Sequence, residues 1–156
     1  MLFLVDGMLG NVAKKLLLLG YDTDYFSGMS DLELIEKAKN EDRIIISKDL
    51  QLIAHAKKSA VQTIPITKED EIEQFLEILG FVHLELNKIC GETARCTKCN
   101  SPTYEIDKLK ISNKVPPKVL EFNEKFWKCD KCHKIYWEGT HIKKLQDFLN
   151  KIKIRS

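Results

Sequence analysis

The chain has 156 residues, 44% of them hydrophobic and 31% charged, and its formal net charge is +2. A chain of this length forms one domain or two small ones. Its composition is that of an ordinary globular protein, without repeats or low-complexity segments. No apolar run approaches the roughly 18 residues that a membrane-spanning helix requires, which excludes such a helix.

The charge is distributed unevenly along the chain. Residues 1–90 hold 10 Lys and Arg against 15 Asp and Glu, a balance of −5, whereas residues 91–156 hold 15 against 8, a balance of +7. An acidic part joined to a basic part indicates that the basic part attracts a polyanion such as a nucleic acid. A solvated lysine surface without a partner is the alternative.

The first 80 residues alternate short apolar runs with segments of helical periodicity. We predict strands near residues 2–5, 21–26, 43–47 and 61–66. The helices expected between and after them lie near residues 12–19, from residue 30, near residues 50–58 and from residue 67 to residue 80. Strands that alternate regularly with helices form a parallel sheet covered by helices on both faces. The sequence therefore predicts an α/β fold.

Local signals mark where two of these helices begin. Ser30, followed three positions later by Glu33, has the spacing of a capping box. Leu32 is then expected on the buried stripe of the same helix. Thr67 is expected to cap the last helix of this part.

Three aspartates are expected at the carboxyl edge of this sheet, where open α/β sheets bind their ligands. Asp6 directly follows the first strand, Asp49 stands two residues after the third, and Asp31 lies in the first turn of the helix after the second. Taken singly, each is explained as a helix cap, a dipole-matched acid or a turn residue. Taken together they indicate a divalent cation, because clustered carboxylates repel one another unless a cation holds them.

Such a cluster favours Mg²⁺ or Mn²⁺, which enzymes that cleave phosphodiesters use. The three aspartates are therefore the candidate catalytic residues. Ser47 is a candidate for holding Asp49 or a metal-bound water, and Lys48 for meeting a phosphate. Asp70 and Glu71 are either a further ligand or surface acids matched to a helix dipole.

Four cysteines form two clasps of identical spacing, Cys96-Thr97-Lys98-Cys99 and Cys129-Asp130-Lys131-Cys132. Two disulfides would need an oxidising compartment, yet no secretory signal segment opens the chain. A redox dithiol would leave the second clasp unexplained. We therefore predict a structural Zn²⁺ on the four sulfurs of Cys96, Cys99, Cys129 and Cys132, a cytoplasmic protein, and no ligand role for Cys90.

The segments around the clasps are typical of a small ribbon. Residues 104–106 are expected to form a strand, and Val115-Pro116-Pro117 a rigid turn that forbids a helix. The chain closes with an amphipathic helix near residues 142–152, which we expect to dock on the α/β part. Basic and aromatic residues near the clasps either contact RNA or belong to the ribbon's surface and small core; the candidates are Lys98, Lys128, Lys131, Lys134, Trp137 and His141.

Several of these segments are similar to a known family. Leu-Val-Asp-Gly-Met-Leu-Gly-Asn-Val-Ala (residues 4–13) resembles the start of a PIN-like ribonuclease domain, and Ser-Asp-Leu-Glu-Leu (30–34) and Ile-Ile-Ser-Lys-Asp (45–49) continue the match. Residues 126–141, Phe-x-x-Cys-x-x-Cys-x-x-x-Tyr-Trp-x-Gly-Thr-His, resemble the zinc ribbon of the mut-seven C-terminal family of RNases. The chain departs from that pattern at Lys14-Lys15, where Arg-Trp-type residues are more frequent.

The resemblance covers nearly the whole chain. It implies a PIN-type nuclease that acts on RNA through a metal bound by Asp6, Asp31 and Asp49. A fourth carboxylate, common in PIN domains, matches no motif in this chain.

We therefore expect a PIN-like parallel sheet with helices on both faces in residues 1–80, a linker in residues 81–91, and a zinc ribbon with a C-terminal helix in residues 92–156. The expected function is metal-dependent cleavage of single-stranded or structured RNA, with the ribbon contributing RNA binding. A non-catalytic RNA- or ribosome-binding protein is the alternative, and a further protein partner stays open.

Two other enzyme classes place acids at the same sheet edge. A receiver-type phosphoacceptor domain has paired acids after the first strand, and a haloacid-type phosphatase has Asp-x-Asp there. Asp6-Gly7-Met8 supplies neither arrangement, so both classes rank below a nuclease.

Overall fold

The computed structural model describes residues 1–156, and its elements fall into two groups. The first group runs β1 (Leu2–Asp6), the 3-10 helix η1 (Gly7–Leu9), α1 (Gly10–Leu18), β2 (Asp22–Phe26), α2 (Asp31–Glu41), β3 (Arg43–Ser47), α3 (Leu50–Lys58), β4 (Thr63–Pro65) and α4 (Glu71–Phe81). The second group runs β5 (Thr103–Ile106), the 3-10 helix η2 (Lys108–Lys110), α5 (Pro117–Phe122), β6 (Phe126–Cys129), β7 (Ile135–Trp137) and α6 (Thr140–Arg155).

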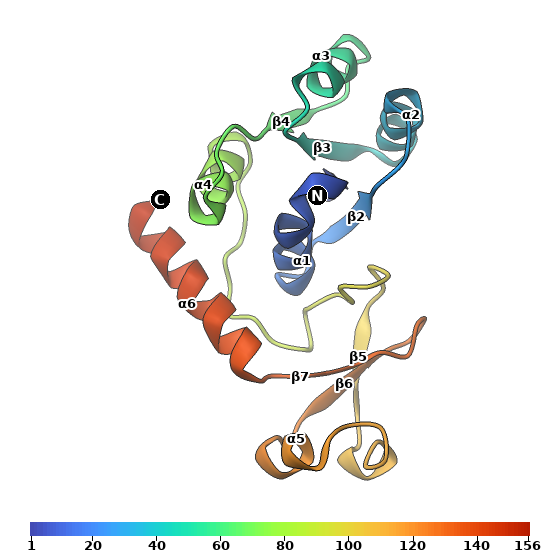
Figure 1. Ribbon diagram of the computed structural model, residues 1–156, viewed down its shortest axis with the longest axis vertical. Coiled ribbons are helices and arrows are strands. Elements are labelled where there is room, and N and C mark those ends of the chain that lie inside the picture. The colour runs from blue at the N-terminus through green and yellow to red at the C-terminus, as the bar shows by residue number, and fades with distance from the viewer.

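The first group builds a four-stranded parallel sheet in the order β2-β1-β3-β4, as the alternation of strands and helices predicted (Figure 1). The central strand β1 pairs with both neighbours, so that Leu2 lies opposite Asp22 on one side and Arg43 on the other. Because all four strands run the same way, the segments that follow β1, β2 and β3 emerge at one edge.

The two faces of the sheet carry separate apolar cores. Alternate side chains of a strand point to opposite faces. Phe3 and Val5 accordingly join a cluster of 17 buried residues that includes α1 and α4, whereas Leu4 joins a cluster of 8 that includes α2 and α3. All three residues are at most 1% exposed, so β1 is buried on both faces, as expected for a central parallel strand.

Helix α6 follows the ribbon in sequence but packs against the first group. Leu145, Leu149 and Ile152, spaced along one face of α6, belong to the larger core cluster of the sheet. Figure 1 shows α6 running alongside α4 at the edge of the molecule. The predicted docking of the C-terminal helix on the α/β part is confirmed.

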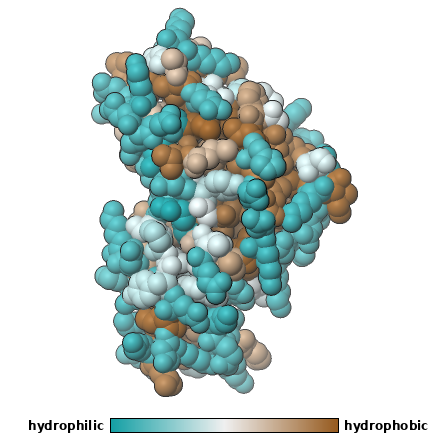
Figure 2. Space-filling model, turned by 180° about the vertical axis from the view of Figure 1, so that it is seen from behind, coloured by the Kyte–Doolittle hydropathy of each residue, from teal (hydrophilic) through white to brown (hydrophobic).

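The ribbon is a small antiparallel sheet in the order β5-β6-β7. Its own core cluster contains only three buried residues, Ile111, Val115 and Phe126. Trp127 is also buried and packs so closely on Gly91 that a Cβ there would come within 2.0 Å of the indole ring. Seen from behind, the ribbon forms the lower of two lobes, with a surface that is largely hydrophilic (Figure 2).

Three local expectations are wrong. Leu32 is 77% exposed, and Leu34, on the neighbouring side of α2, packs against the core in its place. Helix α4 is capped by the Asp70 carboxylate rather than by Thr67. Pro117 opens α5 instead of preventing a helix, because a proline in the first turn lacks only an N–H that has no intrahelical partner.

None of the helices is both long enough and apolar enough to cross a membrane.

Candidate active site and metal centre

An open pocket of about 440 Å³ lies at the carboxyl edge of the parallel sheet. Asp6 enters it from the end of β1, Asp31 from the first turn of α2 and Asp49 from the residue before α3. Apolar side chains, among them Met8 and Met29, complete its wall. The structure therefore brings the three predicted aspartates to one cavity.

Ser47, the last residue of β3, connects two of these aspartates. Its side chain is fully buried, and its hydroxyl donates a hydrogen bond of 2.7 Å to Asp6 Oδ2. The same hydroxyl oxygen accepts a bond of 2.9 Å from the backbone N–H of Asp49. Ser47 thus fixes the Asp6 carboxylate against the segment that carries Asp49, across the pairing of β1 with β3.

Each aspartate also has a local contact of the kind that a structural role requires. Asp6 Oδ1 accepts from the Met8 N–H at 3.2 Å, and Asp49 Oδ1 accepts from two backbone N–H groups in the first turn of α3. Asp31 Oδ2 lies 3.7 Å from His55 Nδ1. The three carboxylates do not converge within 4.8 Å of one another, a spacing that only the cysteine cluster reaches. They frame the pocket and leave room between them.

Other charged groups near this edge are already paired. Lys48 Nζ contacts a carboxylate oxygen of Glu69 at 2.8 Å, and Lys15 Nζ contacts Glu71 at 2.7 Å. The Lys15 hydrogen bond, opposed by partial burial, lowers the pKa of Glu71. Asp70 is occupied as the cap of α4. Neither Asp70 nor Glu71 lines the pocket of the three aspartates.

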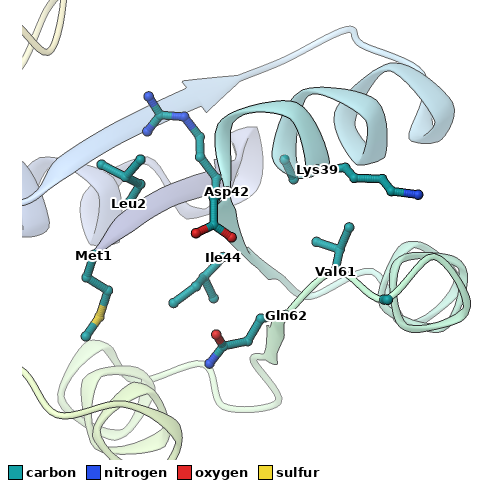
Figure 3. A pocket seen from close by; sticks show the side chains of 10 residues that line it. Met1, Leu2, Lys39, Asp42, Ile44, Val61 and Gln62 are labelled. Atoms are coloured by element: carbon teal, nitrogen blue, oxygen red, sulfur yellow. The ribbon is translucent and has the colours of Figure 1, made fainter.

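The opposite, amino edge of the sheet has a depression of about 250 Å³ with a different character (Figure 3). Met1, Ile44 and Val61 line it together with Gln62, and Asp42 is its only carboxylate. A single acid beside two cationic side chains, Lys39 and Arg43, is not a site for a divalent cation. Of the two depressions, the one at the carboxyl edge is therefore the candidate active site.

The ribbon carries a second candidate centre, made by the two cysteine clasps. The four sulfurs of Cys96, Cys99, Cys129 and Cys132 all lie within 4.8 Å of one another. The Cys96–Cys132 and Cys99–Cys129 sulfur separations are 3.5 and 3.3 Å. Sulfurs held tetrahedrally about 2.3 Å from a zinc ion lie about 3.8 Å apart, so the cluster fits zinc closely.

The backbone around the clasps supports the thiolates. Each clasp is followed by a residue in the left-handed conformation, Asn100 at φ 63° and His133 at φ 64°. These tight turns direct N–H groups at the sulfurs, as from Lys98 to Cys96 Sγ at 3.4 Å. Both clasps therefore present their sulfurs through the same local geometry.

The pKa values of Cys99 and Cys132 differ because the neighbouring sulfurs, at short range, stabilise the thiolate of Cys99 and destabilise that of Cys132. Burial opposes ionisation of Cys99, yet hydrogen bonds centred on Ser101 and the neighbouring sulfurs lower its pKa to about 6. The Lys134 N–H favours the Cys132 thiolate, but burial and the adjacent sulfurs outweigh it and raise its pKa to about 11. A cation that binds all four thiolates removes this competition.

Asn100 joins the ribbon to the edge of the parallel sheet. Its side-chain oxygen accepts from the Thr23 N–H at 3.0 Å, and its amide nitrogen donates to Asp22 Oδ1 at 2.7 Å and to Asp24 Oδ1 at 3.1 Å. Although burial alone would raise it, the hydrogen bonds from Asn100 and Arg43 hold the pKa of Asp22 below its usual value. No spacing in the sequence pointed to these partners, which lie more than 70 residues away in the chain.

The predicted RNA-contact residues are spread around the ribbon and the start of α6. Lys98, Lys131, Lys134 and His141 are exposed, whereas Lys128 and Trp137 are half-buried. The Trp137 ring packs on Phe126, with centroids 6.4 Å apart, and so contributes to the ribbon core.

The fold and these two centres define a class of protein: a parallel α/β domain with an acidic carboxyl edge, joined to a small ribbon with a four-cysteine metal site. Residues 1–149 match the family described as the Mut7-C RNAse domain, so the chain belongs to the Mut7-C RNase family. No curated protein and no solved structure matches the chain. Family membership identifies a ribonuclease in general terms, with RNA as its substrate.

Proposed function

We propose that this protein hydrolyses RNA phosphodiesters at the carboxyl edge of its parallel sheet, with Asp6, Asp31 and Asp49 as the ligands of a catalytic Mg²⁺ or Mn²⁺. One observation carries the proposal. In a chain of an RNase family, three carboxylates from three separate elements line a single open pocket.

The open arrangement of the carboxylates around one pocket is compatible with these ions. Magnesium retains several waters and is held by one or two carboxylates, so its ligands need not close into a complete cage. When bound, such an ion neutralises phosphate oxygens and makes water a stronger nucleophile. Hydrolysis then requires that the attacking water lose a proton as its oxygen bonds to phosphorus, that the ester bond break, and that the leaving oxygen take a proton.

The neighbouring residues have supporting roles in this proposal. Ser47 holds Asp6 and the Asp49 backbone in register through its buried hydroxyl. Lys48 is held by Glu69, whose side chain is 89% exposed, and an exchange of partners would let its ammonium group meet a phosphate. Zinc in the ribbon has a closed four-sulfur shell and therefore a structural role.

We assign part of the RNA affinity to the ribbon and α6, because residues 91–156 carry the positive charge of the chain. Binding that rests on contacts between lysines and phosphates weakens as salt rises, since counterions are released from the nucleic acid. Full-length protein should therefore bind RNA with a strong salt dependence.

The test is Asp6→Asn in the full-length protein, assayed for RNA cleavage with Mg²⁺, with Mn²⁺ and with chelator. We expect near-complete loss of cleavage, because the amide removes one charge from the ligand set. Metal-free stability should stay level or rise, since repulsion between carboxylates is relieved. A purely structural cap would instead cost about 1 kcal/mol.

Asp42→Asn is the matched control. Asp42 has the left-handed φ of 55° that asparagine also tolerates, and it lies at the amino edge of the same sheet. It should leave cleavage unchanged. Equal activity of wild type and Asp6→Asn, or wild-type cleavage that persists in chelator, would exclude the mechanism and favour a non-catalytic RNA-binding protein.

A further inference from the structure

Two further grooves adjoin the pocket of the three aspartates. One, of about 420 Å³, lies between the start of α1 and the start of α4, and it shares Met8 with the acidic pocket. The other, of about 310 Å³, lies between α1 and α6, and it shares Asn11, Lys14 and Glu71 with the first groove. Because neighbouring depressions share these lining residues, they adjoin one another from the carboxyl edge along α1 to the beginning of α6, and this series is called the path below.

The charges along this path are favourable for a polyanion. Lys14 and Lys144 line the grooves and form no ion pair with any carboxylate. The acids of the two grooves, Glu69 and Glu71, are each already paired with a lysine. In these two grooves the lysines thus outnumber the acids, and the two unpaired ammonium groups are free to meet phosphates.

An exposed aromatic ring stands where the path approaches the aspartates. Tyr25, in β2, is 50% exposed and lines the first groove. Its ring rests over Gly10, where an added Cβ would come within 3.3 Å of the Tyr25 hydroxyl oxygen. An exposed ring supported from below is a platform on which an unstacked base can lie, and duplex RNA does not offer such a base.

From these features we propose that single-stranded RNA follows this path to the acidic pocket, with phosphates on Lys14 and Lys144 and a base stacked on Tyr25. This inference rests on the proposed function in one respect: the RNA strand leads toward the acidic pocket because cleavage is proposed there. It also gives His141 a position in the same groove, so that one of the contacts predicted near the ribbon lies on the path.

The test measures binding of a short fluorescein-labelled single-stranded RNA to zinc-loaded full-length protein without added Mg²⁺ or Mn²⁺, so that metal-dependent cleavage does not contribute. Lys14→Ala and Lys144→Ala should each weaken binding and reduce the magnitude of the slope of log affinity against log salt by about 0.7. Tyr25→Leu should weaken binding by about tenfold, while Tyr25→Phe, which keeps the ring, should bind like wild type.

Lys39→Ala is the matched control, since Lys39 is exposed and lies at the amino edge of the sheet. It should leave both affinity and salt slope unchanged. Wild-type binding by Lys14→Ala and Lys144→Ala would overturn the path, as would losses confined to Lys98→Ala and Lys131→Ala in the ribbon. Asp6→Asn separates the two proposals, because it removes cleavage without removing any contact on the path.

Discussion

The α/β part and the ribbon reach stability by different means. Apolar clusters of 17 and 8 buried residues flank the parallel sheet, whereas the ribbon has a cluster of three. A fully buried aliphatic or aromatic side chain contributes about 1.5–3 kcal/mol, and ordering one residue costs about 1–2 kcal/mol. Three such side chains cannot order the ribbon, so we expect its fold to depend on a metal ion held by the four cysteines and on its docking to the sheet.

The boundary between the two parts does not follow the order of the chain. Helix α6 comes after the second cysteine clasp, yet its buried residues belong to the core of the sheet. In the sequence, the ribbon therefore lies between α4 and α6, two helices that belong to the same core. A substitution that unfolds the ribbon should leave that core largely intact, whereas a substitution that disrupts α6 should destabilise the core.

The largest effect is expected from Cys99→Ser, which removes one of four sulfurs from the zinc site. Structural zinc contributes on the order of 10 kcal/mol to the folding of small domains, so the ribbon should unfold while the parallel sheet persists. Metal analysis should fall from one zinc per chain to well below one, and NMR signals of the ribbon should collapse to random-coil positions.

Cys90→Ser is the control for that change, because Cys90 lies outside the cluster and its sulfur contacts only the Thr93 hydroxyl, at 3.3 Å. It should retain one zinc. Wild-type protein purified with much less than one zinc per chain would contradict the assignment of the site.

An intermediate effect is expected from Leu149→Ala in α6. Leu149 is fully buried in the larger core, and truncation of such a leucine costs about 2–5 kcal/mol through lost burial and the cavity that remains. The loss should appear in the unfolding of the α/β part, measured by urea denaturation. Ile154→Ala, on the same helix but at an 85% exposed position, should change stability by less than about 0.5 kcal/mol.

The smallest effect is expected where the two regions meet, at Asn100. Asn100→Gly keeps the left-handed turn but leaves the buried Thr23 N–H without its acceptor, at a cost of about 1–3 kcal/mol. Asn100→Ala should cost about 1 kcal/mol more, because alanine is strained at a φ of 63°.

Hydrogen exchange at the Thr23 amide, with zinc saturating, reports this contact directly. Exchange should accelerate in both Asn100 variants and stay at the wild-type rate in Asn113→Ala, an exposed asparagine in the same lobe. Unchanged protection of Thr23 in Asn100→Gly would show that the side chain does not hold the ribbon to the sheet.

Local signals in the sequence predicted the elements and the four-cysteine cluster. The capping box at Ser30 and the buried run of β3 were predicted because both depend on residues a few positions apart. The four cysteines were predicted as one site because the spacing within each clasp is set by a single turn. The parallel sheet followed from the alternation of strands and helices alone.

The prediction from the sequence was wrong where a periodic pattern is ambiguous. Leu32 has the helical spacing of a core residue but is exposed, since which positions of a helix become buried depends on the elements that pack on it. The same limit applies to the aspartates. Their places at strand ends predicted a shared edge, but the distances between their carboxylates depend on how strands and helices pack.

The sequence by itself thus determined an α/β part, a four-cysteine ribbon and three aspartates at one sheet edge. Only the tertiary structure decided that Asn100 meets Thr23 and that grooves along α1 adjoin the acidic pocket. The reason is the range of the interactions. Caps, turns and clasps are formed by neighbours in the chain, whereas cores and grooves are formed by residues that only folding brings together.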